Sequence, residues 1–207
     1  MCIRDRDMKD LIISPNSSFE WLIKKIENEI DFAKKNLPSG IWIKCNAIVD
    51  SKLIEKLYEA SNAGVKINLF VRGICCLKPN VKGLSENIIV KSIIGRFLEH
   101  GRIYVFANGG EFQSIKNDVY ISSADMMPRN LYTRVEAYVP LKNETVRSQI
   151  LTQVIPALIN DTKNSWLLEQ TGEYVKLEDK LNFCSHSYFM ENPSLSGQGT
   201  LSKFKTA

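Results

Sequence analysis

The sequence has 207 residues, of which 44% are hydrophobic, and it carries a formal net charge of +4. This length and composition suit one domain with a core of its own. No apolar run reaches the ~20 residues that a membrane-spanning helix needs, and the charged residues 1–6 lack the apolar stretch of a secretory signal. The five cysteines are irregularly spaced, which favours reduced thiols over a disulfide framework or a metal site and, with the other features, predicts a cytoplasmic protein.

The first two predicted elements are a strand and a helix. A buried strand at 11–13 leads into a turn, and a helix with apolar residues at helical spacing then runs to about Lys35. Asn16 or Ser17 is expected to cap this helix, with Glu20 placed for a capping box.

The next segment predicts a parallel βαβ unit. A strand at 41–49 is followed by a helix capped by Asp50 or Ser51 and by a strand at 65–71. Two strands joined by one helix within about thirty residues imply parallel pairing and a right-handed crossover. The long loop at 73–86 therefore lies at the edge of the sheet where open α/β folds bind ligands.

The rest of the chain adds strands and one long helix. Strands are predicted at 88–94, 103–107, 119–122, 135–139 and 175–177. The helix at 144–159 is expected to bend at Pro156, and its predicted inward residues are Val146, Ile150, Val154 and Leu158. These elements predict an α/β fold with a mixed, largely parallel sheet flanked by helices.

Charge and chemistry gather in one stretch of the sequence. Between Lys66 and Arg102 lie seven basic and two acidic side chains, a net charge of +5 that favours an anionic partner. His100 is one of two histidines and stands two residues before Arg102, while Ser123 and Asp125 close a strand farther along. Imidazole can transfer a proton or a phosphoryl group near neutral pH, and a guanidinium offers a fork of donors to phosphate oxygens. His186 lies in the polar C-terminal region and is predicted to be structural.

The order of these residues resembles one half of a phospholipase D-type site, the H-x-K…G-S-x-N pattern. His100 and Ser123 match the pattern, whereas Arg102 replaces its lysine and Asp125 its asparagine. Longer strings resemble the C-terminal phospholipase D-like domain of bacterial type 1 polyphosphate kinase. They are Ala60–Ile67, Val71–Leu77, Gly83–Ile88, Gly95–His100, Phe106–Gly110 and Ser123–Leu131.

This resemblance implies a phosphotransferase that moves the terminal phosphate of ATP reversibly onto inorganic polyphosphate through a phosphohistidine. It implies that His100 contacts the nucleotide phosphates and protonates the leaving group, and that Arg72 grips the same phosphates. Further phosphate contacts are predicted at Arg96, Arg102, Ser123, Asp125 and Arg129. For the arginines the alternative is an ion pair with Asp125 or Glu136. The phosphorylated histidine and the Mg²⁺ positions are expected in a preceding domain. The expected partners are therefore ATP and ADP, polyphosphate, the other domains of the enzyme and further copies of it, but not nucleic acid.

The domain plan follows from the same resemblance, which runs from about 11 to 190. Residues 1–10 are predicted to be a leader, foreign at 1–6, and residues 191–207 a flexible tail. We expect the isolated chain to be inactive, because half of the reaction centre is missing, and we expect a cytoplasmic or peripheral inner-membrane location. Two alternatives are a phosphodiesterase half-site that works as a dimer and a non-catalytic polyanion-binding module.

Overall fold

The computed structural model describes residues 10–177 and 182–192. The predicted leader up to residue 9 and the predicted tail from residue 193 lie outside these described residues. No helix among the described residues is long and apolar enough to span a bilayer.

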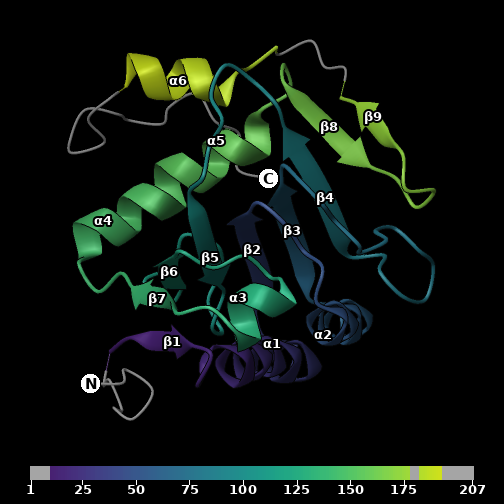
Figure 1. The fold of residues 1–207 in the computed structure, drawn as a ribbon, viewed down its shortest axis with the longest axis vertical. Helices are drawn as coiled ribbons and strands as arrows, with labels where there is room; N and C mark the ends of the chain where they lie inside the picture. The colour runs from purple at the N-terminus through teal and green to yellow at the C-terminus, as the bar shows by residue number, and fades with distance from the viewer. Residues whose placement is uncertain (1–9, 178–181, 193–207) are drawn as a thin grey trace.

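Within the described ranges, nine strands form one mixed sheet in the order β1-β7-β6-β5-β2-β3-β4-β8-β9 (Figure 1). Their bounds are Ile12–Ser14, Gly40–Cys45, Lys66–Val71, Ile88–Ile93, Arg102–Phe106, Asp118–Ser122, Glu136–Pro140, Ser165–Leu168 and Tyr174–Lys176, for β1 to β9 in chain order. The α/β class and the mixed sheet are confirmed. Among these strands, parallel pairing is confined to β2, β3 and β4, whereas the outer strands pair antiparallel. The parallel part is therefore smaller than the sequence predicted, because hairpins extend the sheet on both sides.

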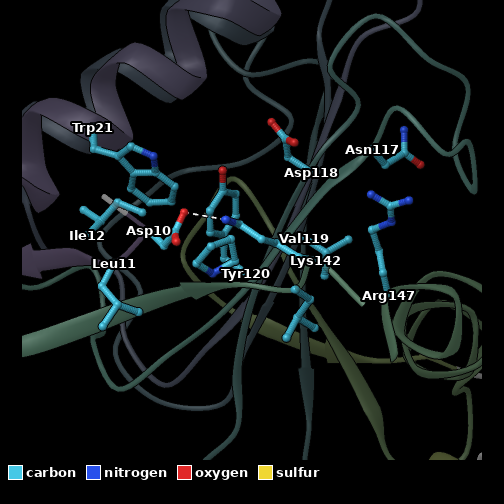
Figure 2. A pocket seen from close by; sticks show the side chains of 12 residues that line it. Asp10, Leu11, Ile12, Trp21, Asn117, Asp118, Val119, Tyr120, Lys142 and Arg147 are labelled. Atoms are coloured by element: carbon cyan, nitrogen blue, oxygen red, sulfur yellow. Dashed lines mark hydrogen bonds and ion pairs between the residues drawn. The ribbon is translucent and has the colours of Figure 1, made fainter. Parts of the chain in front are cut away.

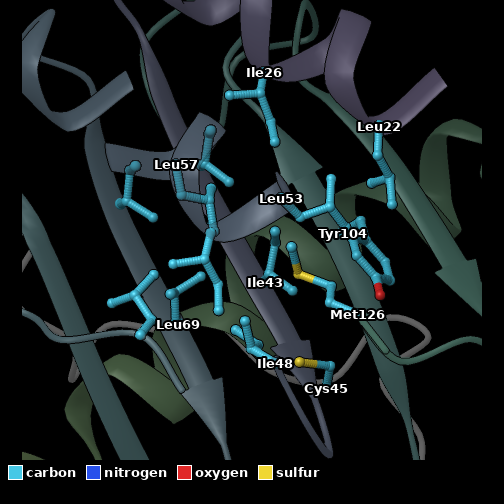
Figure 3. Close-up of a cluster of buried hydrophobic side chains, with 14 of the residues drawn as sticks. Leu22, Ile26, Ile43, Cys45, Ile48, Leu53, Leu57, Leu69, Tyr104 and Met126 are labelled. Carbon is cyan, nitrogen blue, oxygen red and sulfur yellow. The ribbon is translucent and has the colours of Figure 1, made fainter. Parts of the chain in front are cut away.

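Helices cover both faces of the sheet. The helices α1 (Ser18–Lys34) and α2 (Ser51–Asn62) pack side by side on one face, where Leu22, Leu57 and Tyr104 belong to the larger buried cluster (Figure 3). On the other face, Trp42, Phe70 and their neighbours pack against the segment 150–158. Apolar side chains on both faces of the central strands explain why β2 and β3 each hold three successive apolar residues, at 41–43 and at 69–71.

The predicted helix ends are partly confirmed. Asp50 is the N-cap of α2, and its carboxylate accepts a hydrogen bond from the backbone N–H of Leu53 at 3.0 Å. Ser17 is the N-cap of α1, but its hydroxyl donates to the carbonyl of Ile13 and makes no capping contact within the helix. The capping box predicted with Glu20 is therefore wrong, since the Ser17 hydroxyl is used by the preceding strand.

The helix predicted at 144–159 forms in three parts. They are α4 (Glu144–Gln149), a π-helical turn at Ile150–Val154 and α5 (Ile155–Asn160), and together they cross the sheet as one rod (Figure 1). Pro156 has no N–H to donate, and the wider turn before it absorbs that irregularity. The inward prediction is wrong for Val146, which is 41% exposed, because α4 extends beyond the sheet. It is confirmed for the buried Leu158.

Three short elements were not predicted. They are α3 (Pro128–Tyr132), β8 and α6 (Ser185–Glu191). Near them Lys91 of β4 is buried, and its ammonium donates to the carbonyls of Ile159 and Asp161 at 2.6 and 3.0 Å. Burial lowers the pKa of Lys91 to about 8. This lysine ties the end of α5 to the sheet.

Candidate functional site

The predicted site residues meet at one edge of the sheet. The strands β2, β3, β4 and β6 end at this edge, and the antiparallel β5 and β7 begin there. Arg72 follows β3, His100 lies near the end of the loop from β4 to β5, and Asp125 follows β6. The topology thus brings together residues that are more than fifty positions apart in sequence.

Arg72 and His100 are in direct contact. One terminal nitrogen of the guanidinium, Nη2, lies 3.0 Å from His100 Nδ1, and the arginine Nε donates to the carbonyl of Glu99. Arg72 is half-buried, while the His100 ring is exposed. Because a guanidinium can only donate, Nδ1 acts as acceptor and the proton of a neutral ring sits on Nε2. The ring therefore presents an N–H to solvent beside a fixed positive charge.

Gly73 allows the backbone after Arg72 to lie against the end of β2. Its N–H donates to the carbonyl oxygen of Asn46 at 2.9 Å. A Cβ at Gly73 would lie 2.7 Å from that oxygen, a distance that side-chain carbons do not adopt. A glycine at this position therefore fixes where the Arg72 side chain leaves the sheet.

Arg102 and Asp125 form a two-point ion pair beside His100. The guanidinium Nε and Nη2 donate to the two carboxylate oxygens at 2.9 and 2.8 Å, and Nη1 donates to the His100 carbonyl at 3.0 Å. The backbone N–H of Asn46 adds a 2.7 Å hydrogen bond to the carboxylate. Burial by itself raises the pKa of Asp125, but these hydrogen bonds outweigh it and hold the pKa below its ordinary value. The arginine that replaces the lysine of the H-x-K…G-S-x-N pattern thus binds the aspartate that replaces its asparagine.

This pairing predicts strong coupling between the two substitutions. We expect Arg102→Lys and Asp125→Asn each to lower the free energy of unfolding. Each substitution removes the two-point ion pair and leaves a largely buried charged partner behind. The double variant should lose less than the sum of the two, with a coupling energy of about 1–2 kcal/mol. Urea unfolding of the four proteins at neutral pH measures this cycle, and strictly additive losses would contradict the pairing.

The other predicted contacts are distributed around this centre. The Ser123 hydroxyl donates to the Glu136 carboxylate, which also accepts from Asn130 at 2.6 Å. Arg96 and Arg129 are exposed, and the guanidinium carbon of Arg96 lies 5.8 Å from the Phe97 ring centroid. Phosphate contacts at these residues, and at Arg102 and Asp125, stay predictions.

Two site residues were missed from the sequence. Lys44 on β2 pairs with Glu99 at 3.0 Å and donates to the Gly101 carbonyl at 3.1 Å, so it holds both flanks of His100. It is the one charged residue in the predicted strand 41–49, which was an available signal. Asn46 follows the same strand, and its role depends on the distant Asp125, which a local pattern does not reveal.

A cavity of about 460 Å³ lies at the opposite edge of the sheet from His100 (Figure 2). Its walls include the start of β6, the residues after β7 and the N-terminal residues of β1. Lys142 pairs there with Asp10, and Lys25 pairs with Asp118 at 2.6 Å. The charged side chains that line the cavity are Asp10, Asp118, Lys142 and Arg147, so the lining has no net positive charge of the kind that a phosphate site needs.

The described residues do not form a cage for Mg²⁺. In residues 10–177 and 182–192, no group of three or more His, Cys, Asp or Glu side chains is placed to hold a metal ion. The carboxylates of Glu99 and Asp125 at this edge of the sheet are engaged by Lys44 and Arg102. A metal in the reaction would therefore need ligands other than these side chains.

Comparisons with known proteins agree on one family. The family model "Polyphosphate kinase C-terminal domain 2" matches residues 11–185. A polyphosphate kinase from Erythrobacter litoralis is 50% identical over 198 residues, which are 95% of this chain and 28% of that protein. One from Synechocystis is 43% identical over 84% of this chain and 23% of its own length.

A solved structure gives the same result. The crystal structure of polyphosphate kinase from Porphyromonas gingivalis superposes with a TM-score of 0.84 at 32% identity, over 90% of this chain and 28% of that one. The chain thus spans about a quarter of the length of these relatives. On the match over residues 11–185, the chain belongs to the polyphosphate kinase C-terminal domain family.

Proposed function

We propose that this chain supplies the nucleotide-phosphate half of the reaction centre of a polyphosphate kinase. The whole enzyme would transfer the terminal phosphate of ATP reversibly to inorganic polyphosphate. The observation that carries this proposal is the 3.0 Å contact between Arg72 and His100 at the ligand-binding edge of the sheet.

The contact divides the work between the two side chains. The Arg72 donors that are not used by Glu99 and His100 can bind phosphate oxygens and offset the charge that develops during transfer. The His100 Nε2–H can donate a hydrogen bond to the departing ADP oxygen and stabilise the negative charge that develops there. Hydrogen bonding to the leaving group and charge stabilisation at one phosphate require such a pair to converge. Because the ring is exposed, the phosphate can reach it from solvent.

The remaining parts of the reaction would lie outside this chain. We propose that a preceding domain carries the phosphorylated histidine and that Mg²⁺ enters with ATP and is held mainly there. The share of the relatives that this chain leaves uncovered, more than 70% of their length, gives room for such domains. Association of the complete enzyme with further copies of itself is part of the same proposal.

Comparing the chain alone with the complete enzyme tests this division. We expect the 207 residues alone to bind tripolyphosphate but to form no polyphosphate from ATP, since the phosphohistidine is missing. The same residues joined to their natural upstream region should form it, as measured by ADP release and by chain length on gels.

Polyphosphate synthesis by the isolated chain would contradict the division. Hydrolysis of a phosphodiester such as bis(p-nitrophenyl) phosphate by a dimer of the chain would instead favour a phospholipase D-like half-site. Polyanion binding by a complete protein that makes no polyphosphate would favour a binding module.

A further inference from the structure

The short helix α6 carries a histidine that the proposed reaction does not use. His186 is 3% exposed, although its sequence neighbourhood is polar. Its ring lies against the loop at 94–101, which contains His100. We infer that His186 is a positioning residue that sets this loop, and with it His100, for phosphate binding. This inference deepens the proposed function and rests on it.

The ring of His186 holds the middle of the loop directly. Its Nδ1 accepts a hydrogen bond from the backbone N–H of Phe97 at 3.3 Å, and the Phe97 ring packs on it with centroids 5.5 Å apart. A Cβ at Gly95 would lie 2.5 Å from the same Nδ1 and 2.8 Å from Cε1. The imidazole thus fills the space that a side chain at Gly95 would need, and the loop closes over the ring.

The other side of the ring faces the residue before His100. With Nδ1 accepting, a neutral ring carries its proton on Nε2, which lies 3.8 Å from a Glu99 carboxylate oxygen. The second oxygen of Glu99 pairs with Lys44, and its carbonyl accepts from Arg72. Glu99 is therefore held from three directions, and His100 follows it in the chain.

The helix that bears His186 is fixed to the body of the domain. Asp161 is fully buried at the end of α5, and its carboxylate accepts from the Ser185 N–H and hydroxyl at 2.7 and 2.6 Å. The Lys91 ammonium on β4 binds the Asp161 carbonyl. The loop begins on the same support, since the Ile94 N–H donates to the Asn164 carbonyl at 2.9 Å.

The loop needs this support because most of its surface faces solvent. Residues 94–98 are exposed, and Leu98 is 71% exposed, so the loop buries little apolar area of its own. Contacts from outside the loop must set its geometry. The His186 imidazole can set the geometry of the loop, because it accepts from the Phe97 N–H and fills the space beside Gly95. It does this without contacting the phosphate.

The experiment combines ligand binding with a local readout on the 207-residue chain. In His186→Ala we expect the dissociation constant for tripolyphosphate to rise about tenfold, the scale of one lost hydrogen bond. Hydrogen exchange at the Phe97 amide should accelerate by a similar factor. His186→Asn places an amide oxygen where Nδ1 was, so it should restore both quantities to within about threefold.

Two further variants serve as control and as safeguard. Met190→Ala changes an exposed side chain of the same helix and should alter neither quantity. Gly95→Ala keeps His186 but displaces the loop from it, so it should weaken binding even if His186→Ala does not fold.

The outcomes separate this inference from the proposed function. If the unsubstituted chain fails to bind tripolyphosphate, the result counts against the proposed function. Amide exchange at Phe97 needs no ligand, so it still tests whether His186 supports the loop. Normal exchange at Phe97 in His186→Ala, or normal binding by Gly95→Ala, would overturn the positioning role.

Discussion

Replacing His100 with alanine is expected to lower the kcat of the complete enzyme by about 10²–10³, the usual loss when one preorganised hydrogen-bond donor to the developing charge is removed. The ring is exposed, and its side-chain hydrogen bond is the one to Arg72. The unfolding midpoint should therefore change little. ADP release at saturating ATP and polyphosphate, followed as a function of pH, measures the effect.

A second substitution at the same position separates two possible roles of His100. His100→Asn retains an acceptor near the Nδ1 position, where Arg72 binds, but it has no N–H donor at the Nε2 position. We expect its kcat to match that of the alanine variant. Recovery of most of the rate in His100→Asn would mean that His100 acts only by positioning Arg72. A near-normal kcat in His100→Ala would refute its role altogether.

Replacing Arg72 with lysine should lower kcat/KM for ATP by about 10²–10³, the loss typical for one preorganised stabilising group. Lysine keeps the charge, but its single ammonium cannot bind the Glu99 carbonyl, the His100 ring and a phosphate in one plane. Both KM and kcat should suffer, because the same fork binds the phosphate and orients the ring. Steady-state kinetics with varied ATP measures the split.

Arg147→Lys is the matched control for this substitution. Arg147 lines the cavity at the opposite edge of the sheet, so the same chemical change there should leave the kinetics unchanged. Equal losses in the two variants would mean that the loss in Arg72→Lys does not depend on the place of Arg72 beside His100. An unaffected kcat/KM in Arg72→Lys would show that a point charge suffices.

The central elements of the fold follow from local signals. An apolar run marks β2, the Asp50 cap marks the start of α2, and the turn at Asn108-Gly109 follows the end of β5. Each of these signals acts on residues that are close in sequence. The strand β8 and the helix α6 are only four and seven residues long, too short for a periodic pattern to stand out. They are stabilised by pairing with β4 and by the buried Asp161, which are contacts with distant residues.

The site shows the same division between local and distant signals. His100 and Arg72 could be found by their chemistry and the resemblance they carry. For Arg102 the sequence leaves two interpretations open, a phosphate contact or an ion pair with an acidic residue such as Asp125. The sheet decides for the ion pair, because it places the two side chains 2.8–2.9 Å apart. His186 was rightly predicted to be structural, but its contacts with Gly95 and Phe97 span about ninety residues of sequence.

The position of α6 also bears on where this domain should be cut for expression. The family match ends at residue 185, whereas the helix continues to Glu191. A gene fragment trimmed to the matched range would keep the whole sheet and discard the imidazole under the loop. Such a protein would fold, but its loop at 94–101 would lack the support of His186. A failure to bind phosphate would then result from cutting the chain at residue 185.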